Sequence, residues 1–142
     1  MKIFDATLKT LEQALDVRLI EHNVLAGNVS NADTPGYKPK ELNFGEAMRA
    51  AQAQAGGNNA ATMATTDPGH MGPNGGGTTS VSELATSMVV DGAGTSPSFD
   101  GNAVDLDRTM AGMAENGLQY GASAKAAGKK LAILRYAVDG GG

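Results

Sequence analysis

Apolar side chains recur at helical spacing near the N-terminus of the chain. Large apolar residues follow one another at steps of three or four, which places them on one face of a helix. This first row consists of Phe4, Leu8, Leu11, Leu15 and Leu19. A second row beside it consists of Val17, Ile20 and Val24. The pattern predicts an amphipathic helix from Ile3 to about Val29, inside an N-terminal unit 1–31 that ends before Pro35.

The C-terminal part of the chain carries a seven-residue repeat. Two rows of mostly apolar residues form the a and d positions of a heptad seam. They are Leu106, Met113, Tyr120, Ala127 and Leu134 in one row, and Met110, Gly117, Ala124, Leu131 and Val138 in the other. Asp105 is placed to cap the N-terminus of this helix, and Asp107 lies in its first turn. The pattern predicts a helix that fills most of a C-terminal unit 101–142 and is followed by a short glycine tail.

The two units between these helices differ in composition. Residues 32–51 are expected to form a Pro-Gly turn and a short accessory helix, with Asn43 and Glu46 at the spacing of a capping box. Residues 52–100 hold no Lys or Arg, and their apolar residues are mostly Ala and Met. Such a stretch cannot bury enough apolar surface to offset the entropy of ordering it. We therefore expect a Gly-rich loop or a partly ordered insert, with a short extended piece near Met88–Val90.

These elements predict a mainly α fold in which the long N- and C-terminal helices pair as an antiparallel, coiled-coil-like hairpin. A lone pair of long helices leaves part of each apolar stripe in water, so neighbouring chains are expected to bury the remainder. The residues expected to form this subunit-packing seam are Leu8, Leu11, Leu15, Leu106, Met110, Met113, Tyr120, Leu131, Leu134 and Val138. The alternative is a monomeric two-helix hairpin with the middle segment folded over it.

Composition argues against several kinds of site. The chain has 142 residues, two histidines and no cysteine, and its formal net charge is −4. The lack of cysteine excludes a disulfide framework, a thiolate metal site and a cysteine nucleophile, and the negative charge argues against nucleic-acid binding. No apolar run approaches the roughly 18 residues of a membrane span. His22 and His70 do not have metal-ligand spacing, and capping accounts for Asp105 and Asp107, so no catalytic, cofactor or metal site is predicted.

The connector after the first helix is rich in residues that stop a helix and form a turn. Pro35 and Gly36 suit the centre of a type II turn, because proline fixes φ and glycine allows a positive φ. Short polar side chains before the turn bond to nearby backbone groups, and Tyr37 after it offers an amphipathic anchor. The connector residues that stand out are Asn28, Asn31, Asp33, Thr34, Pro35, Gly36 and Tyr37.

This connector resembles the signature of the bacterial flagellar basal-body rod and hook family. The matching residues run from Asn28 to Tyr37, and the segment from Val104 to Tyr120 resembles the closing helix of that family. The resemblance covers roughly residues 3–50 and 100–138. The signature does not choose between members of the family, but the short chain favours the proximal rod proteins over the longer distal rod and hook proteins.

The resemblance implies a structural subunit, not an enzyme, in the axial drive shaft that carries torque from the motor to the hook. The implied partners are other rod subunits and copies of itself, a FliE-like adaptor and the membrane ring at the rod base, and the flagellar export gate. Nucleic acid and a direct membrane span are not implied. The implied location is the basal-body rod that crosses the periplasm, reached by type III export without a cleaved signal peptide. Phe4 and Leu8 match the spacing that such export gates recognise.

Two functions of other classes stay open at this point. A small cell-wall hydrolase would need carboxylates or histidine in a pocket, and turnover on peptidoglycan by a soluble monomer would favour it. A coiled-coil binding module, for example of another secretion assembly, would instead form a defined small oligomer with one soluble partner.

Overall fold

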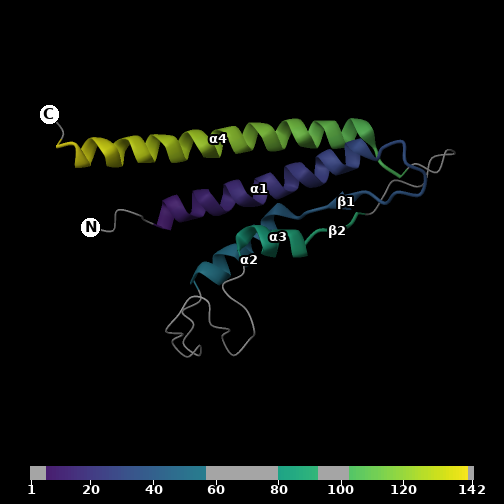
Figure 1. Cartoon of the computed structure of the whole chain (residues 1–142), viewed down its shortest axis with the longest axis horizontal. Helices are drawn as coiled ribbons and strands as arrows, with labels where there is room; N and C mark the ends of the chain where they lie inside the picture. Colours follow the sequence, from purple (N-terminus) through teal and green to yellow (C-terminus); the bar gives the residue numbers. More distant parts are fainter. Residues whose placement is uncertain (1–5, 57–79, 93–102, 141–142) are drawn as a thin grey trace, which may run out of the picture.

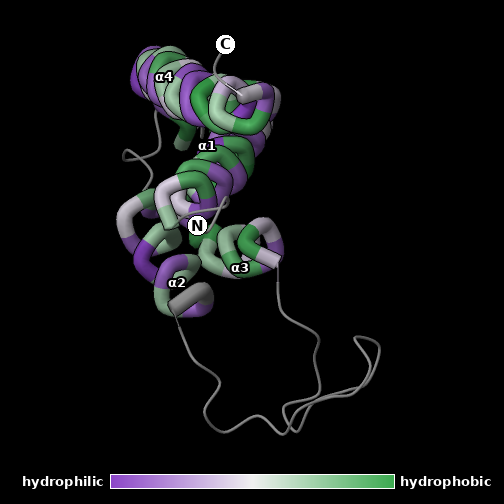
Figure 2. Tube along the Cα trace, turned by 90° about the vertical axis from the view of Figure 1, so that its left-hand side faces the viewer, coloured by the Kyte–Doolittle hydropathy of each residue, from purple (hydrophilic) through white to green (hydrophobic). Residues whose placement is uncertain are grey.

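The computed structural model describes residues 6–56, 80–92 and 103–140. Along the chain the elements are α1 (Ala6–Ser30), β1 (Lys40–Glu41), α2 (Phe44–Gly56), α3 (Val81–Ser87), β2 (Val90–Asp91) and α4 (Leu106–Val138). α1 and α4 lie side by side and run in opposite directions (Figure 1). Seen along the long axis, the molecule has three layers, with α4 first, then α1, then α2 and α3 (Figure 2). The predicted mainly α fold with an antiparallel helical hairpin is confirmed.

Contacts near the middle of the hairpin fix how α1 and α4 pair. The Asn116 amide donates to the carbonyl oxygen of Arg18 at 2.9 Å. Closer to the connector, the Leu25 side chain lies over Gly112, where an added Cβ would stand 3.8 Å from it. Among the described elements, α4 packs against α1 alone. The sides of α4 that face away from α1 are therefore open.

A small core lies on the opposite side of α1. Its buried residues are Val17, Leu42, Ala47 and Ala85, and the half-buried residues around it are Ile20, Phe44, Val81, Met88 and Val89. The two alanines belong to α2 and α3, and their small side chains let these helices lie close to α1. The buried Gln13 side chain adds a polar tie, because its amide donates to the Ala51 carbonyl at 3.1 Å. This core holds the short elements against α1 but leaves α4 untouched.

Arg18 contacts all three layers. Its guanidinium lies 3.6 Å from the centre of the Phe44 ring at the start of α2, a position in which a cation is attracted by the ring electrons. The same guanidinium pairs with Glu21 on α1 at 2.8 Å and donates to the Gln119 side chain on α4. One side chain of α1 thus reaches both the layer above it and the layer below it.

The two predicted helix starts are present. The Asp105 carboxylate accepts a hydrogen bond from the Arg108 amide at 3.0 Å and caps α4. The Asn43 side-chain oxygen accepts one from the Glu46 amide at 3.2 Å, so α2 begins where the capping-box spacing predicts. Local polar residues therefore determine where these helices begin.

The sequence predicts no helix within residues 52–100, but α2 extends to Gly56 and a separate helix, α3, follows at Val81–Ser87. Its start is a full capping box: Ser80 Oγ accepts from the Glu83 amide at 3.1 Å, and the Glu83 carboxylate accepts from the Ser80 amide at 2.9 Å. Ala85 of α3 is buried in the core. Packing against α1 and α2 therefore stabilises a segment that is too short to show a periodic pattern.

The short extended piece expected near Met88–Val90 is present as β2, which overlaps that range at Val90 and ends one residue later. β2 pairs antiparallel with β1, with Lys40 opposite Asp91 and Glu41 opposite Val90. The remaining parts of the Gly-rich segment, 57–79 and 93–100, lie outside the described residues. In the ranges that the structure describes, none of the helices is both long and apolar enough to cross a membrane.

Gly36 occupies a conformation that a side chain disfavours. The Tyr37 amide donates to the Thr34 carbonyl at 3.2 Å, and Gly36 has a φ of +74°, as a type II turn requires. Gly36→Ala is expected to lower the free energy of unfolding by about 1 kcal/mol, because a Cβ is strained at positive φ. Gly27→Ala is the matched control: an added Cβ there meets no atom within 4 Å.

Because alanine is the better helix former, Gly27→Ala is expected to raise the free energy of unfolding by up to about 1 kcal/mol. Urea unfolding of the isolated chain compares the two variants. An equal loss of stability in both would contradict the assignment of Gly36 as the strained position.

Asp16 on α1 links stability to pH. Partial burial, and to a smaller extent the Glu12 carboxylate, raises the pKa of Asp16 above its ordinary value of 3.8. The folded chain therefore holds this proton more tightly than the unfolded chain. This tighter proton binding stabilises the folded chain at pH values below the ordinary pKa. The stabilisation is lost as the pH rises through the folded-state pKa of Asp16.

The Asp16→Asn variant, which stays neutral, is expected to unfold at a higher temperature than the native chain at neutral pH. The difference should disappear below pH 3.8. Thermal melts at acidic and neutral pH check this, and a difference of the same size at both would contradict it.

Candidate assembly interface

Five of the predicted seam residues form an exposed apolar row on α4, which we call the α4 stripe. They are Leu106, Met110, Tyr120, Leu131 and Val138. Their exposed fractions run from 41 % at Tyr120 to 73 % at Val138. The other predicted seam residues are half-buried; they are Leu8, Leu11, Leu15, Met113 and Leu134. The structure thus brings part of the seam into the hairpin and leaves the α4 stripe exposed.

The side of α4 that contacts α1 lies next to the α4 stripe. It has more small and polar residues than the α4 stripe has. The buried and half-buried positions of α4 are Thr109, Gly112, Met113, Asn116, Gln119, Gly121, Ser123, Ala127, Lys130 and Leu134. The predicted row from Met110 to Val138 is exposed at every position, so it does not pack against α1 within the chain. A seven-residue repeat drifts by about 20° per heptad around a straight helix. The polar Asn116, bonded to α1, holds the contact on the neighbouring side.

Apolar surface continues from the α4 stripe onto α1. Leu19 is 49 % exposed and, with Tyr120, lines a pocket of about 250 Å³ between the two helices. The other residues that line this pocket are Arg18, His22, Asn116 and Gly117. Contiguous exposed apolar surface of this kind marks a site of contact with other molecules.

Asn28 is the centre of the connector. Its side chain is 3 % exposed and bonds to both backbone groups of Lys40: the amide donates to the carbonyl at 2.7 Å, and the oxygen accepts from the N–H at 2.8 Å. The same oxygen accepts from the Tyr37 hydroxyl at 3.1 Å. Asn28 thus attaches β1 to the end of α1. The sequence marks Asn28 only as a turn former, since its partner Lys40 lies twelve residues further along the chain.

The other connector residues act locally. The Asn31 amide donates to the Gly27 carbonyl at 2.8 Å, and the Thr34 hydroxyl reaches the Asn31 oxygen at 3.4 Å. Asp33, Thr34 and Pro35 are exposed. The connector therefore combines one buried residue, Asn28, with an exposed turn. We call this end of the hairpin, where α1 ends and α4 begins, the closed end.

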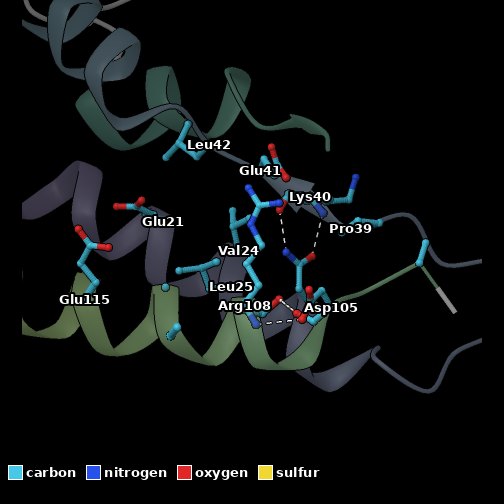
Figure 3. A pocket seen from close by; sticks show the side chains of 15 residues that line it. Glu21, Val24, Leu25, Pro39, Lys40, Glu41, Leu42, Asp105, Arg108 and Glu115 are labelled. Atoms are coloured by element: carbon cyan, nitrogen blue, oxygen red, sulfur yellow. Dashed lines mark hydrogen bonds between the residues drawn. The ribbon is translucent and has the colours of Figure 1, made fainter. Parts of the chain in front are cut away.

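A second pocket, which we call the closed-end pocket, lies between α1, β1 and the first half of α4 (Figure 3). Its volume is about 430 Å³. Val24, Leu25 and Leu42 supply apolar surface. Glu21 and Glu115 lie at the end between α1 and α4, whereas Arg108 reaches across toward β1 (Figure 3). The pocket therefore combines an apolar lining with carboxylates at its α1–α4 end and with both cations and carboxylates toward β1.

The ranges that the structure describes hold no cluster typical of a metal site. No group of three or more His, Cys, Asp or Glu side chains is placed to hold a metal ion in those ranges. His22 lines the pocket beside Tyr120. His70 and the export candidate Phe4 lie outside the described residues, and Leu8 is half-buried on α1.

A hairpin of two long helices, with an exposed apolar row on the longer one, is typical of proteins that assemble through their helices. The family model described as flagella basal body rod protein matches residues 8–38, which include the connector. The chain is 34 % identical over 117 residues to the flagellar basal body rod protein FlgB of Escherichia coli, covering 82 % of this chain and 80 % of that one. It is 29 % identical over 137 residues to FlgB of Salmonella typhimurium, covering 96 % of each chain. This chain therefore belongs to the FlgB family of flagellar basal body rod proteins.

Proposed function

We propose that the chain is a structural subunit of the proximal rod of the bacterial flagellar basal body, and that it assembles through its terminal helices into the axial shaft that transmits torque. The α4 stripe carries this proposal, because large apolar side chains exposed along one helix need a partner surface. Membership of the FlgB family supports the rod as the place where they find it.

The partners proposed for the assembled chain are other rod subunits and copies of itself. A FliE-like adaptor and the membrane ring are the proposed neighbours at the rod base. A neighbouring short rod protein of the FlgC type is the alternative within the same structure. The named relatives favour the FlgB position, since those reported above are all called FlgB.

A deletion strain tests the function. Cells that lack only this chain are expected to build no rod and to be non-motile, and the native gene should restore both. Basal bodies isolated from the restored strain should contain the chain within the rod. A complete rod in the deletion strain, or a chain that is found only outside the basal body, would overturn the proposal.

We also propose that Phe4 and Leu8 are recognised by the export gate, on the strength of their spacing alone. Phe4→Ala is expected to reduce the amount of chain secreted through the flagellar export apparatus, while the amount in the cell stays unchanged. The matched control is Leu19→Ala, a later apolar position of the same predicted row. Immunoblots of the medium and of the cell pellet measure both. Native secretion of Phe4→Ala would remove this role.

A further inference from the structure

Acidic residues gather in the first part of α4 and basic residues in the second part. Within residues 105–115 there are three acids and one base, whereas residues 122–138 hold four bases and no acid; the bases are Lys125, Lys129, Lys130 and Arg135. A helix dipole favours bases only in the last turn, and the sole base there is Arg135. The dipole therefore does not account for the three lysines, which lie one or more turns earlier.

The basic half of α4 is also its most exposed half. Lys125 and Lys129 are exposed, as are Leu131, Ile133 and Val138 around them. In the described part of the chain, only α1 packs against α4, and α4 extends beyond the described start of α1 at this end (Figure 1). The open end of the hairpin is thus a projecting helix with cationic and apolar side chains.

The closed-end pocket has the opposite character at its α1–α4 end. Glu115 is an exposed carboxylate there, and it accepts a hydrogen bond from the Gln119 side chain at 2.9 Å. Glu21 lies beside it and pairs with Arg18. Of the two cations that line the pocket, Lys40 pairs with Asp91 at 3.5 Å, and Arg108 reaches toward β1 (Figure 3). An acidic entrance therefore leads to the apolar lining.

We propose that the basic, apolar end of α4, residues 125–138 of one copy, docks in the closed-end pocket of the next copy. This inference rests on the proposed function, and it adds which two surfaces meet. Lysines of the docked helix approach Glu115, while its apolar side chains cover Val24, Leu25 and Leu42. Charges of opposite sign favour this pairing and oppose the pairing of two like ends.

The two surfaces lie at opposite ends of one molecule, so the contact is heterologous and does not close into a dimer. Each added copy presents a new closed-end pocket at one end and a new basic helix at the other. Such a contact joins successive copies head to tail. A second copy is the occupant that the charges favour, because every copy carries both complementary surfaces.

Charge reversal tests the contact with the purified full-length chain. Glu115→Lys and Lys129→Glu are each expected to raise the concentration needed for self-association by about tenfold, measured by sedimentation velocity at low salt. An equimolar mixture of the two variants should recover association, because lysine at 115 then meets glutamate at 129. Arg49→Glu is the matched control on the exposed side of α2 and should associate as the native chain does.

Native self-association of both single variants would overturn the proposal, and so would a mixture that does not recover. The single variants could also fail to enter the rod and yet self-associate normally. In that case the pocket binds a different protein, and a second copy is excluded as its occupant. Circular dichroism of each variant verifies that the helices remain folded. None of these failures touches the proposed function, which the deletion strain decides separately.

Discussion

Replacing Leu131 with aspartate is expected to abolish incorporation of the chain into the rod while the chain itself remains folded. Leu131 is 49 % exposed, so a polar side chain there changes the free energy of unfolding by less than about 0.5 kcal/mol. In an assembly that covers the α4 stripe, the same carboxylate would be buried without a partner, which is costly. Blots of purified basal bodies from a strain that carries only this variant measure the loss.

Leu118→Asp is the matched control for this prediction. Leu118 is 76 % exposed on the same helix but lies about 140° around the axis from Leu131. The control variant is expected to enter the rod at the native level. Normal rods from Leu131→Asp would show that the α4 stripe is not an assembly surface. Equal exclusion of both variants would show that the loss of incorporation does not depend on the α4 stripe.

Asn28→Ala is expected to lower the free energy of unfolding by about 3 kcal/mol, the largest effect of any single connector residue. The change removes three hydrogen bonds at once, two of them to backbone groups of Lys40. It also leaves a gap at a site that is 3 % exposed. Urea unfolding of the isolated chain measures the loss.

Tyr37→Phe is the reference variant for the size of this effect. It removes only the hydroxyl that donates to Asn28, so a loss of about 1 kcal/mol is expected. If Asn28→Ala costs no more than Tyr37→Phe, then the bonds to Lys40 add little and the connector is held by other contacts.

Periodic and local signals in the sequence predicted the frame of the fold. The apolar rows predicted both long helices, and the caps Asn43 and Asp105 predicted where two helices begin. The turn at Gly36 followed from the φ angles that Pro35 and Gly36 favour. Each of these features depends on residues that are close in sequence, which is why sequence reasoning finds them.

Features that depend on distant partners were not predictable in the same way. α3 has only seven residues, and the sequence signal that remains is the Ser80–Glu83 capping box. The choice of which side of α4 packs on α1 depends on Asn116, whose partner is a backbone carbonyl 98 residues away. Apolar periodicity gives no weight to a polar residue such as Asn116, so the pattern does not show which side of α4 packs on α1.

Arg18 gives the molecule a mechanical property. Its guanidinium is shared between the Phe44 ring, Glu21 and Gln119, and its carbonyl accepts from Asn116. A twisting load applied to α4 at this height is therefore passed through α1 to the start of α2 by side-chain contacts, without passing through the connector. At this level, side-chain contacts of one residue join the three layers directly.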